Sequence, residues 1–371
     1  MRILHTGDLH LDSAFSSFGA KDAQKYRELG RTLLRNIFEC AECEKCQMIL
    51  IAGDLFDSRF VSNDTRSLFT SLVKNSNIPV VIAPGNHDSY GENSFYATVQ
   101  KENILNLFIF NSSELQVFDF DELRVRVMGY AFTSAVLNEN PLLTAKFPED
   151  NGYLKLLCAH ADTSSPLSRY APISNTELLR FGFAYSALGH IHNPEETPLE
   201  SRIRYCGFAE GRSFDELGEG GVFVVDEISC VSRKINLSSR AFFAETRNAG
   251  DGAYLSEKVC NFIEKKEFPQ NSYLRLSVVG NVDAQAIKEL KNDAERIVEE
   301  TGLEFLEIID LTLPIYDGKY LEKDVTLRGE VYRSLLPKLT SADQNEKKQA
   351  ILALKIALAA IDSNNVFDVI N

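Results

Sequence analysis

Short apolar runs alternate with amphipathic stretches over the first 90 residues. The runs at 48–52 and 80–83 are continuously apolar, which is typical of strands covered on both faces. Residues 21–43 and 64–74 carry apolar side chains at spacings of three and four, which predicts helices. With a first strand at 2–6, the order is strand–helix–strand–helix–strand. This order favours a parallel sheet with helices packed on it.

The middle of the chain is richer in strand patterns. Residues 115–120 and 123–129 predict a hairpin, and 154–159 and 184–188 predict further apolar strands. Late strands are expected at 202–206, 221–225 and 230–237. Unusual polar residues follow the carboxyl ends of the early and middle strands, which is the edge where ligands bind in open α/β sheets.

The length of 371 residues exceeds one usual domain. The segment Asn248-Ala-Gly-Asp-Gly252 interrupts the pattern, and a compact β-α-β unit follows, with strands at 274–279 and 304–313 around a helix at 284–301. We therefore predict three parts: a large domain at 1–245, a β-α-β unit at 246–315, and a tail at 316–371. The tail ends in a helix whose apolar run, 350–361, either packs on its own domain or docks a partner.

Acidic residues outnumber basic ones, 53 against 39, which gives a formal net charge of −14. This balance argues against a protein that holds nucleic acid by bulk basicity, although bound metal cations could still serve an anionic substrate. No apolar run approaches the roughly 20 residues of a membrane span, and we expect no secretory signal. Seven cysteines are an odd number, so we expect reduced thiols and a cytoplasmic location.

Carboxylate, imidazole and amide groups gather in motifs at the strand ends. These motifs are Asp8-Leu9-His10, Gly53-Asp54, Gly85-Asn86-His87-Asp88, His160 and Gly189-His190-Ile191-His192. Such groups bind Mn, Fe, Zn and related divalent ions. Seven candidate ligands are too many for one structural site, which usually has four. They suit two ions bridged by one carboxylate, a pair that binds a phosphoryl group and activates water.

The ordered set of motifs resembles the calcineurin-like metallophosphoesterases. Three segments are similar to the SbcD-type DNA repair exonucleases, which are nuclease subunits that pair with a coiled-coil ATPase: Thr6-Gly-Asp-Leu-His-Leu11, Ala52-Gly-Asp-Leu-Phe-Asp57 and Tyr205-Cys-Gly-Phe-Ala-Glu-Gly-Arg-Ser-Phe214. The motifs cover residues 1 to about 226. The resemblance implies a four-layer α/β/β/α metallophosphoesterase sandwich with a small C-terminal α+β capping domain.

The resemblance also implies a role for each motif residue. One ion would be held by Asp8, His10, Asp54 and His192, and the second by Asp54, Asn86, His160 and His190, so that Asp54 is shared. His87 would stabilise the developing charge or protonate the leaving group, and Asp88 would orient His87. Mn²⁺ is the expected ion, with Fe, Zn and Ni as alternatives. Asp57 stands where some members of the family carry a histidine.

The resemblance implies that the protein hydrolyses DNA phosphodiester bonds in DNA repair and needs a metal to do so. It would act as an exonuclease, and endonuclease activity is an additional option. Its expected partners are DNA and a coiled-coil SMC-like ATPase, with a homodimer as a further option. Because the chain is acidic, DNA binding would need a local basic strip (Arg59, Arg66, Arg169 and Arg212 are candidates) or a partner's surface.

Two other functions stay open. One is a metallophosphoesterase for a small substrate such as a cyclic nucleotide, a nucleotide sugar or a phosphomonoester. The predicted capping unit favours the nuclease over this alternative, because a single-domain enzyme would not need it. The other is a non-catalytic scaffold, which predicts missing ligands, whereas all seven are present.

Two further features have structural interpretations. Cys40, Cys43 and Cys46 have cluster-like spacing, but Cys40 lies on the apolar stripe of a helix and a fourth ligand has no obvious source, so we interpret them as structural. His5 lies inside the first strand, where a hydrogen-bonded structural histidine is expected.

Overall fold

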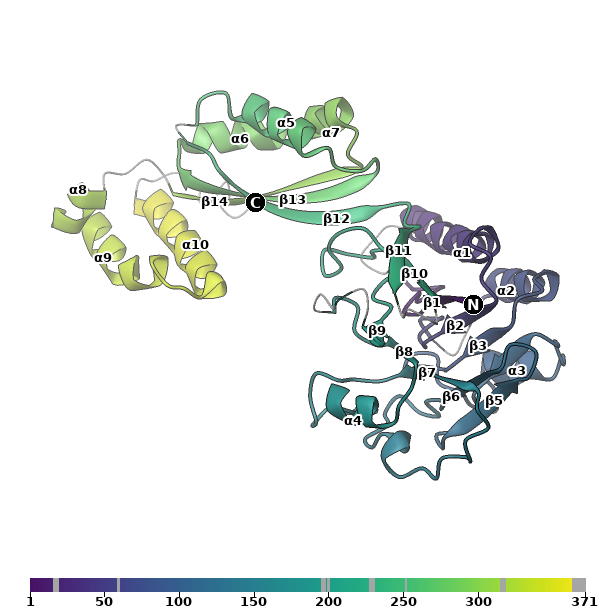
Figure 1. Cartoon of the computed structure of the whole chain (residues 1–371). Helices are drawn as coiled ribbons and strands as arrows, with labels where there is room; N and C mark the ends of the chain where they lie inside the picture. The colour runs from purple at the N-terminus through teal and green to yellow at the C-terminus, as the bar shows by residue number, and fades with distance from the viewer. Residues whose placement is uncertain are drawn as a thin grey trace. The chain divides into compact units, whose positions relative to one another are not determined.

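The computed structural model describes residues 1–15, 20–58, 61–194, 198, 201–226, 231–250, 252–313 and 318–361. The chain forms two compact units, Met1–Ser239 and Arg240–Asn371 (Figure 1). Among the helices that the structure describes, none combines the length and apolar character that crossing a membrane requires.

The first sheet of the N-terminal unit contains the early strands of the chain. Its order is β11-β10-β1-β2-β3-β4, parallel from β1 to β4 and antiparallel at β10 and β11. The strands are β1 (Arg2–Thr6), β2 (Met48–Ile51), β3 (Val80–Ile82), β4 (Leu107–Ile109), β10 (Gly221–Asp226) and β11 (Ser232–Asn236). The helices that connect β1 to β4 are α1 (Ala20–Cys43), α2 (Asn63–Asn75) and α3 (Phe95–Gln100).

The second sheet has the order β5-β6-β7-β8-β9, with β5 and β6 antiparallel and the other neighbours parallel. The strands are β5 (Gln116–Phe120), β6 (Val125–Gly129), β7 (Leu154–His160), β8 (Tyr185–Gly189) and β9 (Ile203–Tyr205). A 3₁₀ turn, η1 (Pro141–Leu143), and helix α4 (Asn175–Arg180) accompany this sheet.

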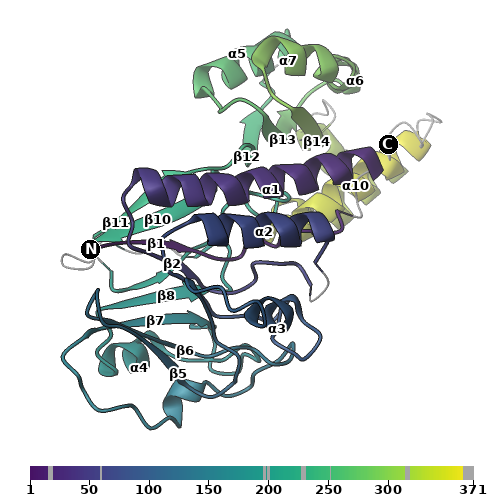
Figure 2. The ribbon, with the colours of Figure 1, turned by 90° about the vertical axis from the view of Figure 1, so that its right-hand side faces the viewer.

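Successive residues of a strand in the N-terminal unit point to opposite faces of its sheet, and the two faces belong to different hydrophobic cores. These cores separate the layers of the unit. In β2, Ile49 packs with residues of α1 and α2, while Leu50 packs in the core between the two sheets. In β7, Cys158 lies in that central core, while Leu157 packs with Leu178 of α4. Figure 2 shows α1 and α2 side by side on the outer face of the first sheet. The predicted four-layer α/β/β/α sandwich is confirmed, and burial on both faces explains the continuously apolar strands.

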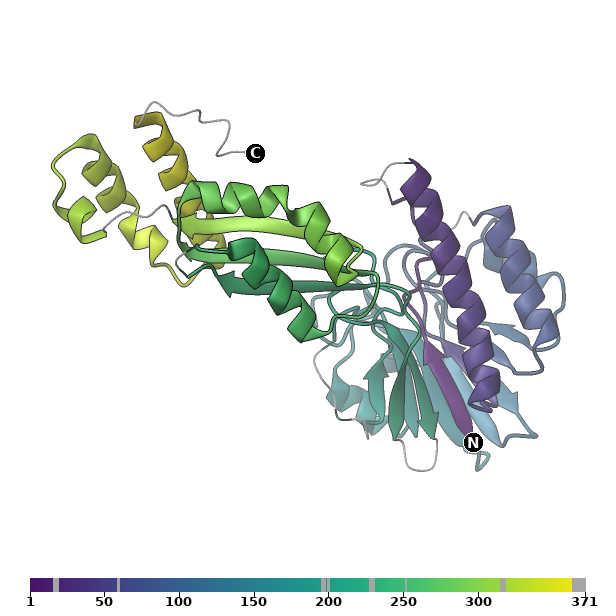
Figure 3. The ribbon, with the colours of Figure 1, turned by 90° about the horizontal axis from the view of Figure 1, so that it is seen from above.

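The C-terminal unit contains a parallel sheet of order β12-β13-β14, formed by β12 (Ala241–Asn248), β13 (Ser272–Asn281) and β14 (Phe305–Leu313). Three helices cover one face: α5 (Leu255–Lys266), α6 (Ala284–Asn292) and α7 (Ala294–Thr301) (Figure 3). The remaining helices are α8 (Gly318–Lys323), α9 (Leu327–Leu339) and α10 (Gln344–Ile361). Residues of α9 and α10 pack on each other and against Leu311 of β14.

The second unit is larger than the β-α-β unit expected at 246–315. It begins after Ser239 rather than after residue 245, because β12 pairs with β13 along its whole length. The expected helix at 284–301 is divided at Asp293 into α6 and α7. The segment expected as a separate tail from residue 316 clusters with this unit as well.

Candidate metal centre

The expected ligands lie in loops at one edge of the two stacked sheets. Asp8 follows β1, Asp54 follows β2, and the turn that contains Asn86 follows β3. In the second sheet, His160 is the last residue of β7 and His190 comes directly after β8. Because these strands are parallel within each sheet, their carboxyl ends meet, and residues separated by up to 184 positions come together.

The backbone of these loops is strained where it carries the polar side chains. Asp8, His10 and Asp54 have φ angles of +50°, +45° and +49°, and His190 has +109°. The left-handed region costs a residue with a side chain roughly 1–2 kcal/mol. Cross-loop hydrogen bonds offset this cost, since Asp8 N donates to Gly53 O at 3.0 Å and His10 N donates to Asp54 O at 2.9 Å. The loops therefore hold these side chains in fixed directions.

Glycines allow the loops to approach one another closely. A Cβ atom at Gly85 would lie 2.2 Å from Asp54 Oδ1, and one at Gly189 would lie 2.1 Å from Ala52 O. Both distances are well inside van der Waals contact. A side chain at either position would displace the loop after β2.

We expect Gly85→Ala to lower the affinity for Mn²⁺ about tenfold to a hundredfold, because the added methyl group displaces the Asp54 carboxylate. Titration calorimetry on the metal-free protein would measure this. The matched control is Gly30→Ala in α1, whose Cβ would meet only the flexible end of Leu11 at 3.3 Å. An unchanged Mn²⁺ affinity in Gly85→Ala would contradict the prediction.

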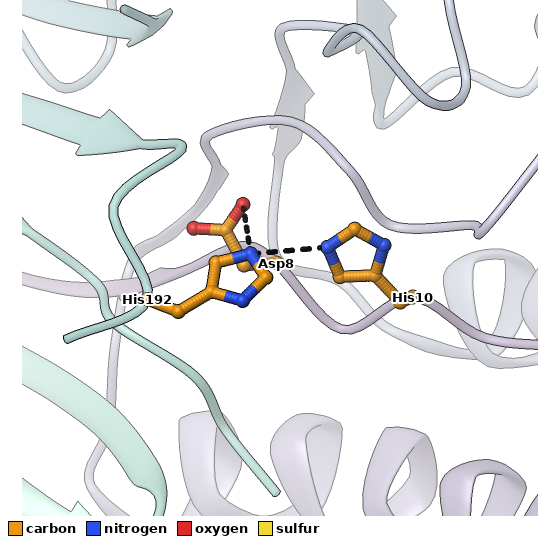
Figure 4. A group of neighbouring side chains, drawn as sticks. All are labelled: Asp8, His10 and His192. Carbon is orange, nitrogen blue, oxygen red and sulfur yellow. Dashed lines mark hydrogen bonds and ion pairs between the residues drawn. The ribbon is translucent and has the colours of Figure 1, made fainter. Parts of the chain in front are cut away.

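In the part of the chain that the structure describes, three groups of side chains have their ligand atoms within 4.8 Å of one another. They are Asp8, His10 and His192; His10, Asp54 and His87; and Asp8, Asp54 and His160. Figure 4 shows the first group, in which His192 Nε2 lies 3.8 Å from Asp8 Oδ1 and 3.2 Å from His10 Nε2. Asp54 Oδ2 lies 3.4 Å from His160 Nε2 and 3.8 Å from His10 Nε2. The groups overlap, since Asp8, His10 and Asp54 each belong to two of them.

The outer nitrogen of each converging imidazole faces an oxygen atom. His10 Nδ1 lies 3.2 Å from Asp57 Oδ1, His192 Nδ1 lies 2.8 Å from Glu216 Oε1, and His160 Nδ1 lies 3.0 Å from Ala52 O. Metal-binding histidines typically donate the outer N–H to a carboxylate or carbonyl in this way. Each ring then directs the lone pair of Nε2 toward the centre of the cluster.

The atoms opposite the two ring nitrogens of His160 indicate whether a metal ion fits this cluster. The carbonyl of Ala52 can only accept, so His160 Nδ1 carries a proton. His160 Nε2 then faces Asn86 Oδ1 at 2.9 Å, which is also an acceptor. A cation between these two atoms would accept both lone pairs. In the neighbouring His10, burial lowers the pKa, which disfavours a second proton on the His10 ring. Imidazole, carboxylate and amide oxygen are the donors that Mn, Fe and Zn use, so the residues fit a divalent ion.

The electrostatics of the carboxylates agree with this arrangement. Burial opposes ionisation of Asp54, but the imidazoles of His160 and His10 outweigh it and lower the pKa of Asp54. Burial opposes ionisation of Glu216 too, but hydrogen bonds from His192 and Arg212 lower its pKa to about 2. Both carboxylates are therefore charged at neutral pH.

His190 is the expected histidine ligand that belongs to none of the three groups found in the described residues. Its backbone N–H donates to Asp8 Oδ2 at 2.9 Å, but its ring lies against those of Tyr170 and His160, with centroids 4.6 and 5.0 Å away. Its Nε2 lies 3.9 Å from Asp162 Oδ2. Burial lowers the pKa of His190 to about 4, so the ring is neutral. The other six expected ligands each have a polar side-chain atom within 4 Å of another one.

His87 lies at the open side of the cluster. Its side chain is 46% exposed, its Nδ1 lies 3.4 Å from Asp57 O, and its ring lies edge-on to His10 at 4.7 Å. Its motif implied a residue that binds no metal, although it also completes one of the three groups of possible ligands.

Asp88 points into the protein beneath the turn that carries His87. Its carboxylate accepts hydrogen bonds from Gly85 N at 2.8 Å, Phe56 N at 3.2 Å and Tyr96 Oη at 2.5 Å. Burial raises the pKa of Asp88 to about 6. Among the contacts described for Asp88, none reaches the ring of His87. The structure therefore gives Asp88 contacts that brace the turn, in place of the expected contact with the His87 ring.

Residues that the sequence motifs did not place at the site complete it. Glu216 contacts His192 from the loop between β9 and β10, Asp162 lies near His190 from the loop after β7, and Cys206 Sγ donates to Asp8 Oδ2 at 3.3 Å. Glu216 lies just beyond the family-like segment that ends at Phe214, and no spacing rule connects it to a histidine. Asp57, which the sequence marked only as a departure from the family, contacts His10.

The described arginines of the candidate basic strip do not gather at the cluster. Of its four arginines, Arg212 lies beside His192, whereas Arg66 stacks on Phe95 of α3, 5.7 Å from the ring centroid. Arg59 lies outside the described residues, and no side-chain contact with the cluster is described for Arg169. His5 Nε2 donates to Leu188 O at 3.2 Å and His5 Nδ1 accepts from Tyr185 Oη at 2.9 Å, as expected of a structural histidine. Cys40 and Cys46 are buried, and no cysteine takes part in the three groups found in the described part of the chain.

Comparison with known proteins agrees with this geometry. A family model for calcineurin-like phosphoesterases matches residues 1–194. The chain is 26% identical over 239 residues to the uncharacterized metallophosphoesterase YhaO of Bacillus subtilis, which covers 61% of this chain and 57% of that protein. It is 26% identical over 261 residues to a subunit of the nuclease SbcCD from Staphylococcus epidermidis, which covers 61% of this chain and 66% of that protein.

The chain thus spans less than two thirds of the length of either relative. The family match covers more than half of the 371 residues and includes every expected ligand. The chain therefore belongs to the calcineurin-like phosphoesterase family, whose members are hydrolases that bind divalent metal ions.

Proposed function

We propose that this protein is a two-metal phosphodiesterase that hydrolyses DNA phosphodiester bonds, as a nuclease acting in DNA repair in the cytoplasm. The observation that supports a pair of ions is the place of Asp54 between the two ligand sets, because its Oδ2 lies 3.8 Å from His10 Nε2 and 3.4 Å from His160 Nε2. The similarity to a nuclease subunit in Staphylococcus epidermidis supports DNA as the substrate.

The proposed ligands divide into two sets that share Asp54. Asp8, His10 and His192 would complete the first set, and Asn86, His160 and His190 the second. Mn²⁺ is the proposed ion, with Fe, Zn and Ni as alternatives. When bound, such ions neutralise the phosphate charge and make water nucleophilic near neutral pH.

The chain's own residues would orient the ligands and transfer a proton. Asp57, Glu216 and the carbonyl of Ala52 keep the outer N–H of three histidines in place, so that the inner nitrogens stay directed toward the ions. His87 would protonate the leaving alkoxide from the open side of the site. Asp88 would hold the turn that positions His87.

A panel of esters tests the nuclease proposal. The full chain with Mn²⁺ is expected to degrade linear duplex DNA and to cleave bis-p-nitrophenyl phosphate, and chelation of the metal should abolish both activities. Cleavage of bis-p-nitrophenyl phosphate without cleavage of linear, single-stranded or circular DNA would contradict the DNA assignment. Elemental analysis that finds no transition metal, even after reconstitution, would favour a non-catalytic scaffold.

A phosphoesterase for a small substrate is the second candidate, and two observations favour it. The chain carries a net charge of −14, which is unfavourable for binding a DNA duplex. A cleft of about 480 Å³ adjoins His192, which is a size suited to a single nucleotide, and Arg212 is the one arginine or lysine among its described lining residues. Cyclic nucleotides, nucleotide sugars and phosphomonoesters in the same panel would distinguish this candidate.

A partner that supplies positive charge would reconcile the acidic chain with DNA. We propose a coiled-coil SMC-like ATPase as this partner, with a homodimer as the accompanying assembly. Running the DNA panel with and without a co-purified ATPase tests the idea. An activity on DNA that the ATPase leaves unchanged would count against this partner.

A further inference from the structure

Arg212 contacts two carboxylates at the edge of the cluster. Its Nη2 donates to Glu216 Oε1 at 2.6 Å, its Nε donates to the same atom at 3.1 Å, and its backbone N–H donates to Glu216 Oε2 at 2.8 Å. Its Nη1 lies 3.8 Å from Asp57 Oδ1. The guanidinium therefore bridges two acidic side chains that come from different loops, one after β2 and one between β9 and β10.

Each of these carboxylates holds one histidine of the first ligand set. Glu216 contacts the outer nitrogen of His192 at 2.8 Å, and Asp57 contacts that of His10 at 3.2 Å. The inner nitrogens of the two rings face each other at 3.2 Å. By contrast, the outer nitrogen of His160, in the second set, faces the backbone carbonyl of Ala52. The two carboxylates that Arg212 contacts thus hold histidines of the first ligand set, whereas His160 of the second set is held by a backbone carbonyl.

We propose that Arg212 is a positioning residue that sets both histidines of one metal site, acting through Glu216 and Asp57. This inference rests on the proposed metal-dependent function. Arg212 would keep the two carboxylates in place, so that they hold the rings of His192 and His10 with the inner nitrogens directed at the same ion.

The need for a cation follows from burial. The side chain of Glu216 is only 5% exposed, and its described partners are His192 and Arg212. A buried carboxylate that loses its cationic partner moves toward water. This movement takes the acceptor oxygen away from the His192 ring. Disturbing such an outer partner typically lowers metal affinity 10- to 100-fold.

The alternative is that Arg212 binds a substrate phosphate directly, because it lines the cleft of about 480 Å³. Its charge, however, is already matched by Glu216 and faces Asp57 as well, so two negative charges surround one positive charge. This arrangement leaves little net attraction for a phosphate in the cleft. The geometry therefore favours positioning over substrate binding.

Metal titration of Arg212→Gln tests the proposal without relying on activity. Calorimetry and electron paramagnetic resonance with Mn²⁺ alone should show one site weakened about 10- to 100-fold and the other within about twofold of the wild type. The spectrum of a coupled ion pair should give way to that of a single Mn²⁺ at equal loading. Arg212→Lys should restore part of the lost affinity. The matched control is Arg233→Gln, which removes a cation that is 61% exposed and paired with Glu44 on the surface.

Several outcomes would overturn the proposal. Wild-type affinity at both sites in Arg212→Gln would do so, and so would a raised KM for bis-p-nitrophenyl phosphate with unchanged Mn²⁺ binding, which would indicate phosphate contact. If Arg212→Gln does not fold, Glu216→Gln decides, because it keeps the side-chain shape and should weaken the same single site. If Arg212→Gln does fold, the double variant Arg212→Gln/Glu216→Gln should lose little more Mn²⁺ affinity than either single variant. If the wild type binds no pair of ions, the proposed function itself fails. If the wild type binds a pair and Arg212→Gln leaves both sites unchanged, only the inference about Arg212 fails.

Discussion

Replacement of Asp54 by asparagine is expected to lower the rate of metal-dependent phosphodiester hydrolysis about a thousandfold or more, a loss of roughly 4 kcal/mol in transition-state stabilisation. Asp54 Oδ2 lies 3.4 Å from His160 Nε2 and 3.8 Å from His10 Nε2, and Asp54 Oδ1 accepts the His87 backbone N–H at 2.9 Å. An amide can keep the bond to His87 and turn its NH₂ group toward His160. The NH₂ group would then donate a hydrogen bond to the lone pair of His160 Nε2, which a metal ion needs for binding.

This geometry also predicts how the Asp54→Asn variant binds metal. The variant should fold and should retain less than one equivalent of Mn²⁺ after dialysis, measured by elemental analysis, because it removes the charge shared by both ligand sets. The matched control is Asp119→Asn, which removes one negative charge from an ion pair with Arg126 on the second sheet, where the Asp119 side chain is 37% exposed. An Asp54→Asn variant that keeps both ions and more than a tenth of the activity would contradict the shared-ligand proposal.

The central strands of the N-terminal unit, such as β2, β3, β6 and β8, were predictable because they are buried on both faces. Such strands read as unbroken apolar runs, as in β2, where all four residues from Met48 to Ile51 are buried. The elements that were missed in this unit are short: α3 and α4 have six residues each, and β4 has three. A segment of that length carries too few positions to show a period.

The C-terminal unit was predicted less completely for a related reason. In β12, Ala241 and Phe242 are buried, but the strand becomes exposed toward Asn248 at the edge of the sheet. An edge strand that is half exposed gives only a weak apolar signal, so the pattern did not distinguish it from a linker. The break between α6 and α7 at Asp293 was also hidden, because the apolar stripe from Ile287 to Ile297 continues across it.

The candidate ligands were predictable because each follows a strand that the sequence shows clearly. Their orienting partners were not predictable, since Glu216 reaches His192 only through the path of the loop between β9 and β10. Asp88 illustrates a different limit. Its place next to His87 in the sequence suggested a contact, but in a tight turn neighbouring side chains diverge, and the Asp88 carboxylate faces the N–H groups of Gly85 and Phe56.

His87→Ala is expected to lower the turnover of DNA about 10²- to 10⁴-fold, the range of a lost general acid, while Mn²⁺ binding stays within about twofold. The reason is its location: the side chain is 46% exposed and its Nδ1 contacts only the Asp57 loop in the described structure. Turnover of linear DNA under saturating Mn²⁺, with metal content measured on the same sample, checks both parts.

The leaving group separates proton donation from the other roles that His87 could have. The alkoxide released from DNA needs a proton, whereas p-nitrophenolate departs without one, so the loss in His87→Ala should be at least tenfold smaller on bis-p-nitrophenyl phosphate. Equal losses on both substrates would instead indicate that His87 stabilises charge on the phosphate. Loss of a metal ion would make His87 a ligand, as its grouping with His10 and Asp54 allows. Because each outcome changes a different measured quantity, this one variant decides which role the exposed imidazole has.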